Sequence, residues 1–204
     1  MSRILLGLMG LVMLPACAQS VCSVAGMAGE VHSGAKLLKV GDGLQAGAEI
    51  RTGADSRVRL RCVDGSSLVL GDKSQLTLTS FTAPTASQPR AAALWLEVGV
   101  LGQKVASGGP GSSWEVRTPS AVTAVRGTEF IVEVSAEQAT AVHVDKGEVA
   151  VESTVKTRGL VPRPPTKLDI KINGTQCAAS GGCTAASAWS AERVQAVQSR
   201  LEGV

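Results

Sequence analysis

The sequence predicts an all-β fold: an antiparallel sandwich, or a rolled, solenoid-like sheet built from two similar halves, with a short C-terminal helix. Short segments alternate apolar and polar residues, as strands with one buried face do. Gly and Asp turn signals separate these segments. No strand–helix–strand rhythm is visible, which argues against an α/β nucleotide-binding fold.

Residues 1–18 have the pattern of a secretory signal peptide and stand apart from the fold. Arg3 supplies the positive charge, and an apolar run over residues 4–14 follows it. That run is too short to span a bilayer, and no later segment is long and apolar enough for a transmembrane helix. The protein is therefore expected in the periplasm or cell envelope of a bacterium.

Two cleavage patterns overlap at the end of this segment. Ala16 and Ala18 form an A-x-A site around Cys17, which would release a soluble protein beginning at Gln19. Residues 14–17 resemble a lipobox, which would make Cys17 a lipidated anchor. Because Pro15 is atypical of a lipobox, the sequence favours simple secretion.

A β domain is expected over residues 24–153. Its clearest strand, residues 57–63, places Val58 and Leu60 on one face. The other face carries three like charges: Arg57, Arg59 and Arg61. Such a row is most commonly solvated or paired with acids of neighbouring strands, and the acids with suitable phase are Glu129, Glu133, Glu148 and Glu152. The alternative is a binding face for an anionic polymer.

Two weakly similar halves are visible within this domain, residues 31–81 and 94–151. Each contains a strand, an acidic-Gly turn and a return strand, "LRCVDGSSLVL" in the first and "AVHVDKGEVAV" in the second. A polar, Pro- and Ala-containing stretch at 82–93 separates them. The pattern suggests an internal repeat, although hairpins resemble one another.

The stretch "RTPSAVTAVRGTEFIVEV", residues 117–134, is expected to hold shape and not to perform chemistry. Pro119 fixes its own φ and keeps Thr118 extended. Gly127 allows a positive φ or a close backbone approach. The remaining residues of the motif are expected to anchor the core or to form an ion pair: Thr128 and Phe130 on the buried face, and Arg126 with Glu129.

The last fifty residues change in character. Residues 154–184 are expected to be an extended linker followed by a hairpin, with Asn173 and Gly174 at its turn. Residues 185–204 are expected to contain the helix, because Val194, Val197 and Leu201 recur at helical spacing.

Removal of the signal peptide leaves four cysteines, an even number that suggests disulfides in an oxidising compartment. Three pairings are conceivable. Cys177 and Cys183 flank a flexible "AASGG" loop and form the favoured pair, which leaves Cys22 with Cys62. A metal site with His32 or His143 is the minor alternative, because metal ligands are usually more closely spaced.

Catalytic patterns are weak throughout. Asp42 and Asp64 have turn chemistry, and no nucleophile elbow opens a helix. The Gly-rich stretch at 107–113 lacks the Lys and helix of a phosphate loop. A net charge of +3 with interspersed charges gives no reason to expect nucleic-acid binding. The sequence therefore predicts no enzyme, no cofactor and no metal.

Several separated motifs occur in an order that resembles the FecR domain of bacterial envelope proteins. They are "GDGLQAGAEIRTGADSRVRLRCVDGSSLVLG", "LEVGVLGQKV", "WEVRTPSAVTAVRGTEFIVEV" and "TAVHVDKGEVAV". The core of the match covers residues 50–151. The resemblance implies an all-β, non-enzymatic domain, whose best-known members are transmembrane sensors that relay an outer-membrane receptor's state to a cytoplasmic sigma factor.

This chain departs from those sensors, because it carries a signal peptide in place of a cytoplasmic segment and a transmembrane helix. It is expected to be a stand-alone envelope module, and the resemblance does not carry the iron-signalling role over to it. The leading hypothesis is interaction with an unknown envelope protein, by scaffolding, signalling or addition of a strand to a sheet edge. The alternative is binding of an anionic cell-wall or surface glycan on the arginine row.

Overall fold

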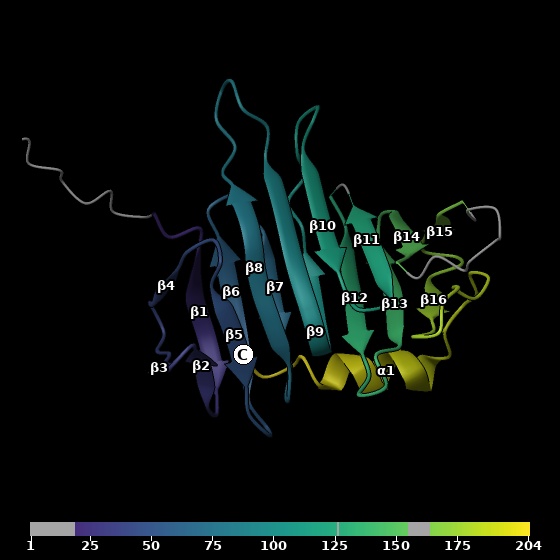
Figure 1. The fold of residues 1–204 in the computed structure, drawn as a ribbon, viewed down its shortest axis with the longest axis horizontal. Helices are drawn as coiled ribbons and strands as arrows, with labels where there is room; N and C mark the ends of the chain where they lie inside the picture. The colour runs from purple at the N-terminus through teal and green to yellow at the C-terminus, as the bar shows by residue number, and fades with distance from the viewer. Residues whose placement is uncertain (1–18, 126, 155–163) are drawn as a thin grey trace, which may run out of the picture.

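The structure is a computed structural model that describes residues 19–125, 127–154 and 164–204. Its strands form two stacked layers, sheet A and sheet B. One helix lies at the lower end of β9 (Ala91–Lys104), β12 (Glu129–Val134) and β13 (Thr140–Lys146) (Figure 1). The all-β fold and the C-terminal helix expected from the sequence are confirmed. The expected signal peptide with Cys17, the Arg126 side chain and linker residues 155–163 lie outside the described residues.

Both sheets run from an edge formed by N-terminal strands to an edge formed by C-terminal strands. Sheet A contains, in spatial order, β4 (Gly43–Leu44), β1 (Cys22–Ala28), β6 (Arg57–Cys62), β7 (Ser67–Leu70), the second part of β9 (Ala91–Lys104), β12 (Glu129–Val134), β13 (Thr140–Lys146) and β16 (Gly174–Cys177). Sheet B contains β3 (Lys36–Leu37), β2 (Val31–Ser33), β5 (Glu49–Thr52), β8 (Gln75–Thr82), the first part of β9, β10 (Ser113–Arg117), β11 (Ala121–Val125), β14 (Val149–Ser153) and β15 (Thr166–Leu168).

Strand β9 belongs to both sheets and joins them into one. Its first part pairs with β8 and β10, and its second part pairs with β7 and β12. The change occurs at Gly99, whose φ is +100° and where a Cβ would lie 1.9 Å from the Ser74 Oγ. That hydroxyl accepts a hydrogen bond from the Val100 amide at 2.9 Å. Glycine is therefore required at the bend.

The two halves share one connectivity. Strands β5 to β8 visit sheets B, A, A and B, with β6 paired to β7 and β5 to β8. Strands β11 to β14 repeat this order, with β12 paired to β13 and β11 to β14. The hairpin β6–β7 therefore corresponds to β12–β13. The two similar sequence segments, "LRCVDGSSLVL" and "AVHVDKGEVAV", instead match β6–β7 with β13–β14. Strands β13 and β14 lie in different sheets and do not form a hairpin.

The inward faces of both sheets meet in a single core. Aliphatic side chains dominate it, and Phe81 meets Trp114 edge to face with ring centroids 6.2 Å apart. Phe130 is 1% exposed, and Val58 and Leu60 are fully buried. The alternating pattern of the sequence thus fixes which side of each strand faces inward.

Three local expectations need correction. Strands β9 and β10 run parallel, so the sheet is mixed and not purely antiparallel. Strands β15 and β16 pair with β14 and β13 and not with each other, so the hairpin at Asn173 and Gly174 does not form. Each strand instead extends an existing edge, which satisfies more backbone groups than an isolated two-stranded hairpin would. The helix, α1 (Ala191–Ser199), covers only the middle of residues 185–204.

Both disulfides favoured by the sequence are present. Cys22 and Cys62 are cross-strand partners on β1 and β6, and Cys177 is bonded to Cys183 across a small loop. The second bond starts a return segment whose residues 183–187 lie along β16. From there the chain enters α1, whose N-cap Ser190 accepts a hydrogen bond from the Arg193 amide.

Candidate functional site

The arginine row lies on the outer face of sheet A, but it does not act as one unit. Arg57 donates a hydrogen bond from Nε to the Arg200 carbonyl oxygen at 3.0 Å. Arg59 and Arg61 are exposed, and among the described residues neither has an ion pair or a hydrogen bond from its side chain. The structure therefore leaves two free guanidinium groups next to one that holds the C-terminal segment.

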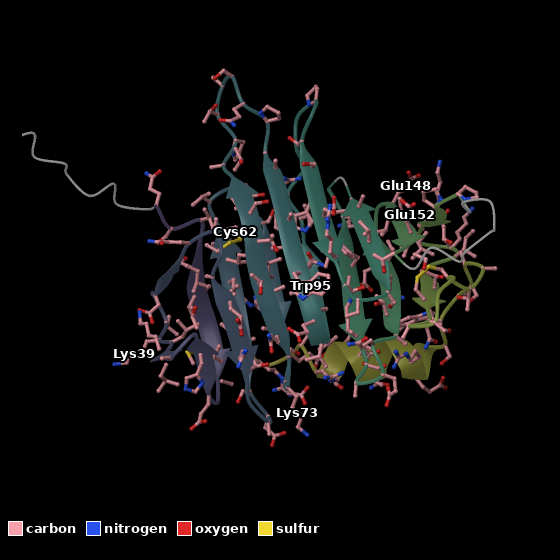
Figure 2. The ribbon with its side chains drawn as sticks, in the orientation of Figure 1. Lys39, Cys62, Lys73, Trp95, Glu148 and Glu152 are labelled. Carbon is pink, nitrogen blue, oxygen red and sulfur yellow. A yellow bond between two sulfur atoms is a disulfide. The ribbon has the colours of Figure 1, made fainter. Side chains whose placement is uncertain are left out.

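The acids expected to neutralise this row have other partners or lie elsewhere. Glu129 faces Lys104 at 3.0 Å and Lys146 at 3.9 Å. Glu133 forms ion pairs with Arg193 and Arg200. Figure 2 shows Glu148 and Glu152 near the C-terminal edge, far from Cys62 at the end of β6. The expectation of internal pairing is wrong for these four acids.

A groove of about 430 Å³ runs between the outer face of sheet A and the segment that follows α1. Arg59 and Lys104 line it, but so do acids and an amide: Glu129, Asp145, Glu202 and Gln198. The groove is consequently of mixed charge, and it interrupts the cationic surface that the arginine row alone would suggest.

The outer face of sheet B is different, because in the described part of the chain no helix or strand covers it. Trp95 of β9 lies on this face and is 36% exposed. Its cross-strand neighbours are Thr77 on β8 and Arg117 on β10. The next positions carry small side chains, Ala93 and Ala124. Figure 2 shows Trp95 in the middle of the molecule, and its strand lies between β8 and β10.

The charged side chains closest to Trp95 on this face already have partners. Arg117 is paired with Glu115 on the same strand, and the Glu115 carboxylate raises the pKa of Arg117. Gln75 donates a hydrogen bond to Glu97 at 2.7 Å. The other large apolar side chains that are exposed in the described ranges lie on an edge strand or in turns: Leu37, Val40, Val63, Ile170 and Ile172. Trp95 is thus the exposed apolar group at the centre of a sheet.

The free sheet edges are short. β3 and β4 at one side have two residues each, and β15 at the other side has three. Lys36 of β3 donates a hydrogen bond to Asp42, which lowers the pKa of that carboxyl, and the pair holds the edge loop. Short edge strands are a common protection against unwanted strand addition.

Residues 117–134 form the elements that the sequence suggested. Gly127 has a φ of +66°, and a Cβ there would lie 3.0 Å from the Ser107 Oγ. Thr118 bonds to Ala121 and to the Thr140 hydroxyl, which closes the turn around Pro119. Thr128 and Phe130 point inward. The described residues of this stretch therefore pack and bond within the sheets on either side of residue 126.

Two groups were missed by reasoning from sequence. Asp64, expected to be a plain turn residue, forms a buried ion pair with Arg90 at 2.9 Å. His143, expected on a sheet face, does occupy the outer face of sheet A, but Trp189 stacks on it and leaves it 2% exposed. Neither contact has a local sequence signal, because each joins residues more than twenty positions apart.

No group of His, Cys, Asp and Glu that could hold a metal ion occurs among the described residues. Within the same ranges no helix is both long and apolar enough to cross a membrane.

A family model described as the FecR protein matches residues 48–150, just over half of the 204 residues. The chain belongs to the FecR family. None of the curated proteins matches it. The FecR-family chain is similar in fold to two crystal structures, at 1.65 and 2.50 Å resolution, of a candidate anti-sigma factor from Parabacteroides distasonis.

Both likenesses are of fold, with TM-scores of 0.53 and 0.55 and 20% sequence identity in each case. They cover 72% of this FecR-family chain, which in turn spans 63% and 62% of those proteins, less than two thirds of their length.

Proposed function

We propose that this FecR-family protein is an exported, non-enzymatic module that binds a partner protein on the outer face of sheet B. The observation that carries the proposal is Trp95, a large aromatic side chain that is 36% exposed at the centre of a sheet face that no described helix or strand covers. Tryptophan is among the residues that most often dominate the energy of protein interfaces.

Face docking is supported over strand addition by the shape of the edges. The free edge strands offer two or three residues each, which is little backbone for a partner strand to pair with. Trp95, by contrast, lies in the interior of sheet B between β8 and β10, and the charged side chains closest to it already have partners.

Export is supported by the two disulfides, because such bonds persist in oxidising compartments. Residues 1–18 supply the signal for it, either as a cleaved leader or, through Cys17, as the site of a lipid anchor. Metabolic labelling with palmitate distinguishes these: label that depends on Cys17 identifies the anchor, and its absence identifies simple secretion.

The variant Trp95→Ser tests the docking face. Because only 36% of the residue is exposed, the change also removes packing against its cross-strand neighbours, and stability should fall by roughly 1–2 kcal/mol, with the cooperative melt retained. Capture of envelope proteins by chemical crosslinking should be lost in this variant and kept in the matched control Leu37→Ser, which removes an exposed apolar group from edge strand β3. The reverse pattern would refute face docking and favour strand addition at that edge.

A second candidate function is binding of an anionic cell-wall or surface glycan. It is favoured by the free guanidinium groups of Arg59 and Arg61. Arg57→Gln is left out of the test because Arg57 holds the C-terminal segment. Retention on lipopolysaccharide or cell-wall fractions should fall with salt and in Arg59→Gln/Arg61→Gln. Retention that is the same at high salt and in the double variant would eliminate this candidate.

A further inference from the structure

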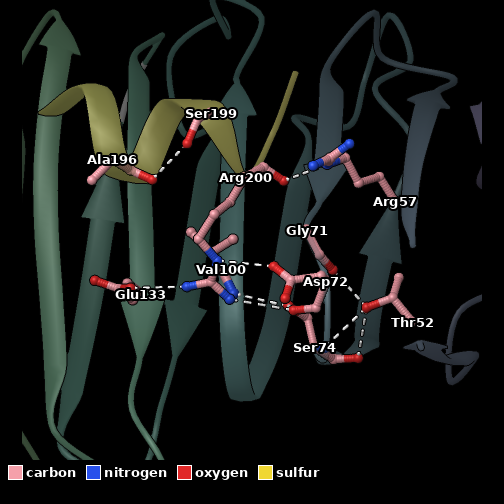
Figure 3. Close-up of polar contacts among 10 residues, drawn as sticks. All are labelled: Thr52, Arg57, Gly71, Asp72, Ser74, Val100, Glu133, Ala196, Ser199 and Arg200. Carbon is pink, nitrogen blue, oxygen red and sulfur yellow. Dashed lines mark hydrogen bonds and ion pairs between the residues drawn. The ribbon is translucent and has the colours of Figure 1, made fainter. Parts of the chain in front are cut away.

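The segment 187–204 crosses the outer face of sheet A from β16 towards β1. Trp189 stacks on His143 of β13, with ring centroids 5.1 Å apart. Val197 is fully buried against Val100 of β9 and Ile131 of β12. The segment thus covers an apolar strip that would otherwise face water. Figure 3 shows α1 lying across the strands of sheet A.

The surface beneath the segment is shaped to receive it. A Cβ at Gly102 of β9 would lie 2.7 Å from the Leu201 Cδ1, and one at Gly174 would lie 1.9 Å from the Trp189 Nε1. A Cβ at Gly71, just after β7, would lie 3.0 Å from the Arg200 carbonyl oxygen. Absent side chains at three points along the path create the depressions into which the segment fits.

Charge complements this shape. Arg200 lies between two acids of the sheet, with Nε 2.9 Å from Asp72 and Nη1 3.0 Å from Glu133 (Figure 3). Glu133 is also paired with Arg193, which in turn lies over the Trp189 ring at 4.8 Å. The sheet therefore presents carboxylates beside an apolar strip, and the segment presents arginines beside apolar anchors.

The segment itself is weakly held compared with the sheets. Its helix has nine residues, too few to be stable alone in water. Val197 is its one fully buried side chain within the described residues. Its ion pairs are partly exposed, and such pairs contribute little. Local undocking of the part after Ser187 should therefore precede unfolding of the sheets, whose backbone hydrogen bonds reach the segment only at Ser187, next to Gly174 of β16, among the described residues.

We propose that this surface, the sheet A docking strip, is a docking site for an amphipathic helix of a partner protein that places two arginines against the sheet, and that residues 187–204 occupy the strip until the partner displaces them. The strip is defined by Gly71, Asp72, Val100, Gly102, Ile131 and Glu133. It selects an occupant with two arginines and two aliphatic anchors, spaced as Arg193, Val197, Arg200 and Leu201 are. This site is separate from the Trp95 face and does not depend on it.

The test compares an opened chain with a matched control. Val197→Asp places a charge in the apolar contact and should release the segment, whereas Ala196→Asp adds the same charge on the exposed side of α1. The probes are a fluorescent peptide of residues 187–204 and a charge-reversed peptide with Glu at both arginine positions. The opened chain should bind the first peptide at least about tenfold more tightly than the control does, and the second at least about tenfold more weakly than the first.

Several outcomes would overturn the proposal. One is an opened chain with both disulfides and a cooperative melt that binds neither peptide. Another is equal binding of the two peptides, which would remove the role of Asp72 and Glu133. A third is a dimer of the parent chain that dissociates in Val197→Asp, which would make a second copy the occupant.

A second opened variant covers the case in which Val197→Asp does not fold. Arg200→Glu places a third carboxylate beside Asp72 and Glu133 at the docking strip and leaves the Val197 contact unchanged. It should give the same gain in peptide binding. Trp95→Ser should leave peptide binding unchanged, so failure of this proposal is distinguishable from failure of the Trp95 face.

Discussion

The ion pair between Asp64 and Arg90 is the most deeply buried charge contact among the described residues, with side chains 1% and 2% exposed. Arg90 also donates to the Ala106 carbonyl oxygen at 2.7 Å and lies over the Trp114 ring. Asp64 accepts further hydrogen bonds from the amide and hydroxyl of Ser66. A turn residue thereby fixes the loop that follows β9.

Breaking this pair should be costly. Asp64→Asn leaves the Arg90 charge buried without compensation, and the free energy of unfolding should fall by about 3–5 kcal/mol. Urea unfolding of the purified chain measures it. The double variant Asp64→Asn/Arg90→Met removes both charges and should recover much of the loss. A single variant as stable as the parent would show that water already reaches Arg90.

At the level of elements, the two disulfides close loops of very different length. Cys22 and Cys62 are 40 residues apart, and Cys177 and Cys183 are 6 apart. A crosslink stabilises mainly by restricting the unfolded chain, and the restriction grows with loop length. The first bond should therefore contribute more stability than the second.

The corresponding serine double variants make this measurable. Loss of the Cys22–Cys62 bond should lower the unfolding free energy by about 4 kcal/mol, and loss of the Cys177–Cys183 bond by about 2.4 kcal/mol, by the loop-entropy relation. Thermal or urea melts under non-reducing conditions give both values. The reverse order would show that the small loop acts by stabilising the native edge at β16 and not by restricting the unfolded chain.

The strands could be predicted from the sequence, but many of their pairings could not. Alternation along residues 57–62 or 129–134 states which side chains face inward, because the period of a strand is local. Partner choice is not local: β15 and β16 leave a favourable Asn-Gly turn unused because edges of β14 and β13 are available. The partners of Glu133 come from α1 and the residue after it, sixty residues or more further on.

The same limit applies to the candidate surfaces. The exposed arginines were visible as a row, since alternation alone places them on one face. Trp95 was not recognised, because its strand also carries Leu94 and Leu96. Its exposure depends on whether another element packs on the outer face of sheet B. The sequence could state neither that sheet A is covered nor that sheet B is open.

For the whole molecule, β9 makes the two sheets one cooperative unit. It pairs with four strands across both layers, and one core cluster spans both halves of the chain. Calorimetry of the disulfide-bonded protein should therefore show a single main transition with equal calorimetric and van't Hoff enthalpies. Two separate main transitions would show that the halves fold independently and that Gly99 is a linker between them.

The path of residues 187–204 also determines when the outer face of sheet A is covered during folding. The segment ends beside the first strands, with the Arg200 carbonyl on Arg57 of β6 and Val204 next to Gly26 of β1. An exported chain that crosses the membrane from its N-terminus delivers the N-terminal strands to the envelope first. The apolar strip over Val100 and Ile131 therefore arrives before its own cover, residues 187–204. During that interval a chaperone is the natural occupant, and the growing polypeptide is at its most vulnerable to aggregation.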